Sequence, residues 1–70
     1  MKTIDMFAER LKELRITRNL TLKELANAIN VSDIAISRWE NKLRVPNIEY
    51  LVLLAQYFEV STDYLVGLEN

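Results

Sequence analysis

Apolar residues recur along this 70-residue chain at steps of three and four, the spacing that lines one face of an α-helix. The first run predicts a helix over about residues 4–18, with its apolar face formed by Ile4, Phe7, Leu11 and Leu14. No stretch alternates apolar and polar side chains as a half-buried strand does, and one Gly and one Pro leave little hairpin chemistry. The pattern therefore predicts an all-α protein.

Capping residues divide the rest of the chain into four more short helices. Thr21 and Glu24 have the spacing of a capping box at the start of a second helix. Ser32, Asn47 and Ser61 stand where each can cap the helix that follows it. The predicted stops tolerate a left-handed backbone and are Asn19, Asn30 and Gly67. Short helices joined by short turns predict a compact five-helix bundle that spans residues 1–70 as a single domain.

The apolar positions of these helices supply the expected core. The inward residues after the first helix are Leu25, Ala26, Ile29, Ile36, Trp39, Ile48, Leu51, Leu54, Ala55, Phe58, Tyr64 and Leu65. The large aromatic residues fall on these apolar faces, so we interpret them as core or core-edge residues rather than as ligand-stacking ones. Hydrophobic residues make up 50% of the chain, which favours a packed globule over a disordered tail.

Charge is unevenly distributed, although the net charge is only −1. Residues 10–44 carry eight basic and four acidic side chains, whereas residues 45–70 carry four acidic and no basic ones. One interpretation is a mixed solvated surface. The split favours a bipolar molecule instead, with a basic half suited to a polyanion.

Composition excludes several kinds of chemistry. The chain has no Cys and no His, which rules out disulfides, zinc fingers and histidine-based catalysis. We find no paired-acid constellation and no Gly-rich phosphate loop, so we expect no enzyme, metal, cofactor or small-molecule ligand. The longest apolar run, residues 50–55, is far below the ~20 residues that cross a bilayer. With no signal-peptide pattern, we expect a cytoplasmic protein.

Residues 20–46, LTLKELANAINVSDIAISRWENKLRVP, resemble the helix-turn-helix of phage repressor and Cro-type (XRE) regulators. RLKELRITRNLT matches the end of the family's first helix, and NIEYLVLLAQYFEVSTDYLVGLE matches its last two helices. The resemblance thus covers nearly the whole chain and implies a lambda-repressor-like fold that binds double-stranded DNA.

The resemblance also implies roles for individual residues. Arg15 and Glu40 match a pair that bridges the first helix to the end of the third. The positions that face base edges are Asp33, Ile34, Ser37 and Arg38. The phosphate-contacting positions are Thr21, Leu22 through its backbone amide, Asn41, Lys42 and Arg44.

Two departures from the family pattern matter. Leu22 stands where the family usually has Gln, which removes a side-chain contact to the phosphate backbone. Gly is common at the positions of Lys42 and Glu59, so these residues either carry left-handed strain or take another conformation.

The start of the predicted recognition helix allows several interpretations. Asp33 suits the helix dipole and can also accept a hydrogen bond from cytosine N4. Ile34 can contact a thymine methyl, join a protein–protein patch, or remain an isolated surface aliphatic. Arg38 is the strongest candidate for base reading, because Arg paired with guanine is the commonest specific contact; a phosphate contact or a solvated charge is its alternative.

Two functions follow. The first is a bacterial or phage transcriptional regulator, expected to be a repressor, that binds operator half-sites as a dimer. Its dimer contact would lie in the C-terminal half, in the acidic and apolar segment 60–68. The second is a protein-binding module on the same fold, such as an antitoxin or anti-repressor partner, which the apolar and acidic start of the third helix favours.

Overall fold

The computed structural model describes residues 2–69, and over that range it consists of five α-helices with no strand. The all-α prediction is therefore confirmed. The helices are α1 (Thr3–Thr17), α2 (Leu22–Ile29), α3 (Asp33–Glu40), α4 (Ile48–Phe58) and α5 (Thr62–Val66).

The helix starts lie where the capping residues predict them. The Glu24 N–H donates to Thr21 Oγ1 at 3.0 Å while the Thr21 N–H donates to Glu24 Oε1 at 2.9 Å, so the capping box of α2 is complete. Ser32, Asn47 and Ser61 each accept a hydrogen bond from the backbone amide three residues on. Each cap satisfies an amide that the first turn of a helix leaves unpaired.

Among residues 2–69, five adopt a left-handed backbone: Asn19 (φ 57°), Asn30 (61°), Lys42 (65°), Glu59 (57°) and Gly67 (90°). Lys42 and Glu59 thus take the conformation that Gly usually provides, which settles the alternative left open by the sequence. A Cβ in this region approaches the backbone closely, at a cost of about 1–2 kcal/mol. The chain therefore stores strain at the end of α3 and at the end of α4.

The core is shared by all five helices. Leu11, Leu25, Ile36, Leu54 and Leu65 are fully buried, one from each helix in order. Tyr64 is half-buried beside them, whereas Phe7, Trp39 and Phe58 are buried, as the sequence predicts.

The prediction that Ile48 belongs to the core is wrong. Ile48 shares the helical period of Leu51, Leu54 and Ala55, but its side chain is 80% exposed. The period gives the direction in which a side chain points, not whether another element lies there. In this fold no other described element covers the Ile48 side chain, although Tyr50 in the same turn packs against the core.

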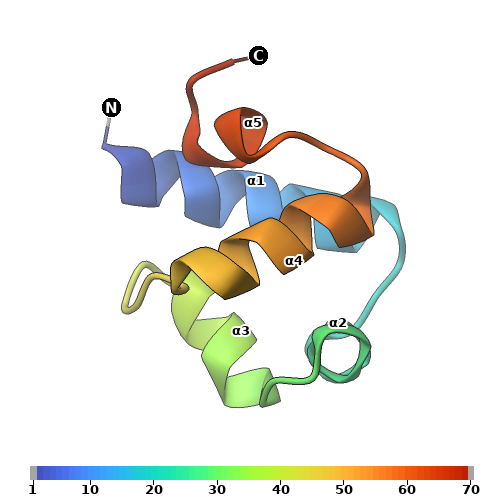
Figure 1. Cartoon of the computed structure of the whole chain (residues 1–70). Helices are drawn as coiled ribbons and strands as arrows, with labels where there is room; N and C mark the ends of the chain where they lie inside the picture. Colours follow the sequence, from blue (N-terminus) through green and yellow to red (C-terminus); the bar gives the residue numbers. More distant parts are fainter. Residues whose placement is uncertain (1, 70) are drawn as a thin grey trace.

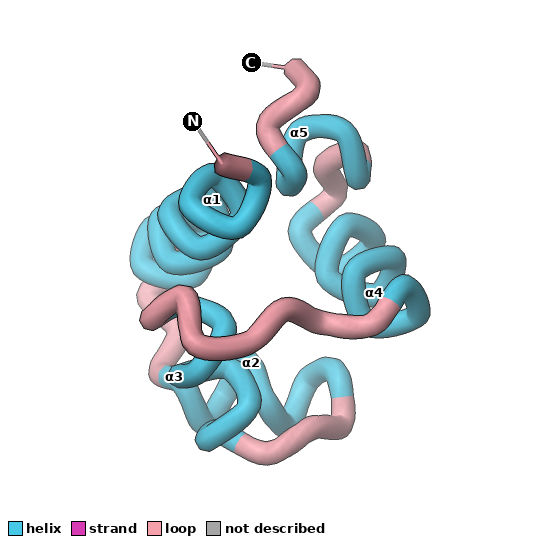
Figure 2. Tube along the Cα trace, turned by 90° about the vertical axis from the view of Figure 1, so that its left-hand side faces the viewer, coloured by secondary structure: helices cyan, strands magenta, loops and turns pink. Residues whose placement is uncertain are grey.

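The arrangement places α2 and α3 on the side of the molecule opposite α5 (Figure 1). Figure 2 shows the same separation from a second direction, with the loop between α3 and α4 crossing between the two parts. Within residues 2–69, no helix is long and apolar enough to cross a membrane.

Candidate nucleic-acid interface

Helices α2 and α3 pack against each other across the turn 30–32. Ile36 and Trp39 anchor α3 on its inner side, and the ring of Trp39 lies 5.9 Å from that of Tyr50 on α4. The opposite side of α3 faces outward, with Ile34 58% exposed and Arg38 exposed. The buried side fixes the helix, so the outward side is presented in one orientation.

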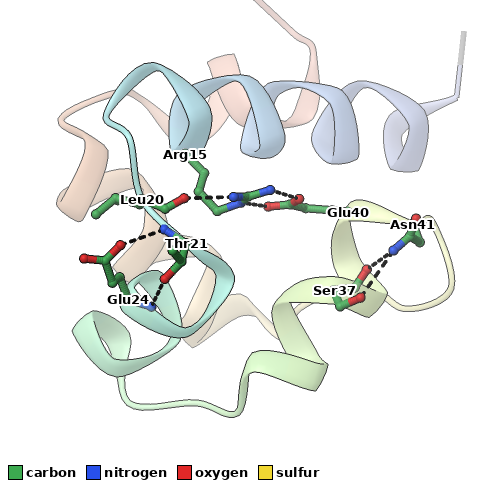
Figure 3. A network of polar contacts seen from close by, with 7 residues as sticks. All are labelled: Arg15, Leu20, Thr21, Glu24, Ser37, Glu40 and Asn41. Carbon is green, nitrogen blue, oxygen red and sulfur yellow. Dashed lines mark hydrogen bonds and ion pairs between the residues drawn. The ribbon is translucent and has the colours of Figure 1, made fainter.

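Arg15 joins α1 to both ends of this unit (Figure 3). Its Nε and Nη2 donate to the two carboxylate oxygens of Glu40, at 2.7 and 2.9 Å, and Nη1 donates to the backbone carbonyl of Leu20 at 2.8 Å. Only 13% of the Arg15 side chain and 5% of the Glu40 side chain are exposed. The hydrogen bonds that Arg15 donates to the Glu40 carboxylate raise the pKa of Arg15 above its ordinary value. This two-pronged pair holds the end of α3 at a set angle to α1.

The four predicted base-facing residues differ in their solvent exposure and in their hydrogen bonds. Asp33, Ile34 and Arg38 are exposed, whereas Ser37 is half-buried. Ser37 also accepts from the Asn41 amide nitrogen, through its carbonyl oxygen at 2.8 Å and its hydroxyl at 3.3 Å. Arg38 is therefore the long, exposed donor of this face, and Ser37 is a short side chain in contact with Asn41.

The start of α2 supplies two of the predicted phosphate positions. Thr21 is exposed, but its hydroxyl is occupied by the capping box. Leu22 is half-buried and its side chain packs against the core, so only its backbone amide is available for a phosphate. The side chain that replaces the family Gln thus stabilises the fold and leaves the backbone amide to bind.

The other three predicted phosphate positions follow α3 and are all exposed. The Asn41 side chain turns back onto Ser37. Lys42 Nζ lies 3.5 Å from Asp5 Oδ1 of α1, an ion pair between two partly exposed side chains. Arg44 has no ion-pair partner among residues 2–69. Of the three, Arg44 is thus the cation free to meet a phosphate without breaking a contact.

Two basic residues of the predicted basic half face elsewhere. Arg18 donates to the carbonyls of Tyr57 and Phe58 at 3.1 and 3.0 Å, at the end of α4. Arg10 donates to the carbonyl of Tyr64 and lies over its ring, with 4.3 Å between the guanidinium carbon and the ring centroid. The sequence gives no local signal for these clamps, because their partners are 39 to 54 residues away. Both guanidinium groups are thus engaged with α4 and α5 and not with α3.

The described residues contain no group of three or more Asp or Glu side chains placed to hold a metal ion. This face offers hydrogen-bond donors, helix amides and the guanidinium groups of Arg38 and Arg44, which have no ion-pair partner among residues 2–69. These are the groups that bind phosphate oxygens and base edges.

Comparison with known proteins identifies the same unit. The family model described as "Helix-turn-helix" matches residues 11–65. The chain is 41% identical over 64 residues to the HTH-type transcriptional activator BcrR of Enterococcus faecalis, covering 91% of this chain and 31% of that protein. It is 35% identical over 65 residues to the uncharacterized HTH-type transcriptional regulator YobD of Bacillus subtilis, covering 93% of this chain and 58% of YobD.

A phage protein is also similar. Repressor protein C2 of Salmonella phage P22 is 33% identical over 61 residues, covering 87% of this chain and 28% of the phage protein. The matched region therefore spans 28 to 58% of the length of these relatives. The similarity bears on the domain described above and not on the rest of the relatives.

Proposed function

The chain belongs to the helix-turn-helix family of the phage repressor and Cro type, and from that premise we propose that it is a sequence-specific DNA-binding transcription regulator. The observation that carries the proposal is the outward face of α3, whose inner side is anchored by buried residues and by the Arg15–Glu40 pair. The family and the names of the relatives also support the prediction that the domain is not an enzyme.

In this proposal α3 lies in the major groove. Arg38 reads guanine through O6 and N7, Ser37 adds a short contact, and Asp33 and Ile34 set the preference at neighbouring base pairs. Thr21, the Leu22 amide, Asn41, Lys42 and Arg44 bind phosphates on the two sides of the groove and fix the register. Since Asp33 repels phosphates and Ile34 has no hydrogen-bonding group, specificity depends strongly on Arg38.

We also propose that two copies bind two half-sites, through contacts in the C-terminal half. The extents of one domain, measured on Cα atoms, are 27 × 24 × 22 Å. Half-sites one turn apart are about 34–36 Å from centre to centre. One domain thus covers one half-site, and two copies meet only at an edge. In segment 60–68, Leu65 is buried while Val60 and Val66 are half-buried, so Leu68 is its one highly exposed apolar residue.

The experiment is an unbiased selection of bound DNA followed by gel-shift titration at several salt concentrations. We expect a defined sequence, and affinity that falls with salt because counterions are released. Arg38→Ala should relax preference at one base pair by about 1–3 kcal/mol of discrimination. Lys12→Ala on the exposed side of α1 is the matched control and should leave the preference unchanged. No enriched sequence and no salt-dependent binding would contradict the proposal.

The sign of regulation is part of the proposal. The resemblance to phage repressors favours repression, and binding at a site that overlaps a promoter would block transcription. A reporter that carries the selected site across its promoter should be less active when the protein is present. An increase in activity would instead indicate an activator, as BcrR is named.

The exposure of Ile34 favours a second candidate function, a protein-binding module. An aliphatic side chain that is 58% exposed beside Asp33 suits a protein surface better than a phosphate-rich groove. If the selection enriches no DNA and a single partner protein co-purifies at near-equal yield, the protein-binding module is the better explanation.

A further inference from the structure

The side chain of Asn41, the residue that follows α3, is folded back onto the last turn of that helix. The backbone N–H of Asn41 donates to the Ser37 carbonyl at 3.0 Å. The side-chain nitrogen donates to the same carbonyl at 2.8 Å and to the Ser37 hydroxyl oxygen at 3.3 Å (Figure 3). Two hydrogen bonds to one carbonyl thus hold the Asn41 amide against the Ser37 side chain.

This contact has a definite polarity. A carbonyl oxygen at 2.8 Å requires a donor, so the amide must present its nitrogen and not its oxygen to Ser37. A serine hydroxyl has one hydrogen and two lone pairs, and here one lone pair accepts from Asn41. Among residues 2–69 the Ser37 hydroxyl makes no other hydrogen bond. Its own hydrogen therefore has no acceptor within the described part of the protein.

Ser37 lies where that hydrogen can be used by DNA. It is half-buried and stands beside the exposed Arg38, on the face of α3 proposed to enter the major groove. The acceptors that bases present in this groove are guanine O6 and N7, adenine N7 and thymine O4, whereas cytosine presents only the N4 donor. A hydroxyl that already accepts from the protein is completed by a base that accepts in turn.

We propose that Asn41 is a positioning residue that makes Ser37 a hydrogen-bond donor, so that the base pair beside Ser37 is selected for an acceptor and against cytosine. The inference rests on the proposed function and assigns a specificity role within the same face. It adds to the phosphate contact proposed for Asn41. One amide hydrogen shared by the two Ser37 oxygens leaves the second hydrogen for a phosphate.

The roles proposed for Asn41 have different signatures. A phosphate contact changes the affinity for every sequence alike. A merely structural role as the end of α3 changes the free energy of unfolding and the affinity, again without regard to sequence. Only the orientation of Ser37 changes the preference at a single base pair.

The test uses Asn41→Asp, which keeps the shape of the side chain but replaces the donating nitrogen with an oxygen that only accepts. The Ser37 hydroxyl then no longer accepts from residue 41 and can donate to the protein instead. Asn47→Asp is the matched control, because it makes the same change and adds the same charge at an exposed position. Asp caps a helix about as well as Asn, so the start of α4 should tolerate it.

Selection of bound DNA with wild-type and Ser37→Ala protein first locates the base pair that depends on Ser37. Titrations on half-site duplexes that carry either the selected base or cytosine there then measure the preference. We expect wild-type protein to prefer the selected base by about three- to tenfold, the range of one neutral hydrogen bond. Asn41→Asp should reduce this preference to about twofold or less, and its charge should also weaken binding to all sequences. Asn47→Asp should keep the wild-type preference.

A double variant shows whether Asn41 acts through Ser37. In a Ser37→Ala background, Asn41→Asp should not change the preference at that base pair. An equal change in both backgrounds would overturn the proposal, as would cytosine as the selected base, an unchanged preference in Asn41→Asp, or no base pair that depends on Ser37. Each of these results requires that wild-type protein selects DNA, so the proposed function would stand. If wild-type protein enriches no sequence, the proposed function fails and the role of Asn41 fails with it.

The contact itself can be measured without DNA. The side-chain N–H resonances of Asn41 in the NMR spectrum should shift when Ser37→Ala removes the hydroxyl, whereas those of Asn47 should not. Unchanged Asn41 resonances would show that the hydroxyl is not its partner, and would overturn the proposal even where DNA is bound.

Discussion

Helix α1 is bound to the two halves of the molecule by arginines that use different chemistry. Toward α2–α3, Arg15 grips a carboxylate that is almost fully buried. Toward α4–α5, Arg18 and Arg10 grip backbone carbonyls near the ends of those helices and lie over aromatic rings. The first contact joins two charges, whereas the second joins a charge to neutral dipoles.

The two kinds of contact constrain the two halves of the molecule to different degrees. A carbonyl that loses its arginine can be hydrated where it is near the surface, so a carbonyl clamp adds stability and fixes little else. A buried carboxylate that loses its arginine remains charged without compensation. The fork geometry of the pair also permits few angles between α1 and α3. The half proposed to read DNA is thus held by the Arg15–Glu40 pair, the contact that most strictly fixes the angle between α1 and α3.

The largest effect should come from removing one member of the buried pair. Arg15→Met leaves Glu40, with 5% of its side chain exposed, without its cation, and should cost about 3–5 kcal/mol of unfolding free energy. Urea denaturation followed by circular dichroism measures the loss. The double variant Arg15→Met/Glu40→Leu should recover most of the stability but not the DNA affinity, if orientation is what the pair supplies. A loss below about 1 kcal/mol in the single variant would show that the pair behaves as a surface contact.

The carbonyl clamp should give a smaller effect with no consequence for DNA. Arg18→Gln removes donors to Tyr57 and Phe58 and should cost about 1–2 kcal/mol. Since Arg18 contacts α4 and not α3, the affinity of folded protein for the selected site should stay within about twofold. A large loss of affinity with a small loss of stability would mean that the two halves are not separable as described.

Local contacts were the part of this comparison that could be predicted from the sequence. The capping box joins Thr21 and Glu24 within one turn, and its chemistry requires only that spacing. The periods of α2, α3 and α4 likewise identified most of the core. The Arg15–Glu40 pair spans 25 residues and was expected only through the family resemblance.

Surface contacts between residues far apart in the chain could not be predicted from the sequence. No periodicity connects Arg18 to Phe58 or Lys42 to Asp5, because their proximity depends on how whole helices pack. The exposure of Ile48 was missed for the same reason. The candidate DNA contacts therefore follow from the family pattern, whereas the arginine clamps and the exposure of Ile48 are visible only in the structure.

Two glycine substitutions at similarly strained positions, one at the end of α3 and one at the end of α4, compare the effects of the two halves on DNA binding. Lys42 and Glu59 hold φ angles of 65° and 57° at the ends of α3 and α4. Replacing either with Gly should stabilise the protein by about 0.5–1 kcal/mol, since relief of strain exceeds the entropy that Gly adds to the unfolded chain. Thermal unfolding measures the gain. Only Lys42→Gly should also weaken DNA binding, because Glu59 lies in the half away from α3. Equal loss of affinity in both variants would contradict the division.

The smallest effect should come from the exposed ion pair that links α1 to the loop after α3. Lys42 and Asp5 keep 45% and 34% of their side chains exposed, so Asp5→Asn should change unfolding free energy by less than about 0.5 kcal/mol. It should nevertheless strengthen DNA binding at low salt by a few fold, because Lys42 no longer shares its charge with a carboxylate. Lys42→Gln should do the opposite and lower the slope of log affinity against log salt by about one. If Asp5→Asn weakens binding instead, Asp5 holds Lys42 in its DNA-contacting position. The ion pair would then orient a DNA-contacting residue, as the Arg15–Glu40 pair is proposed to orient α3.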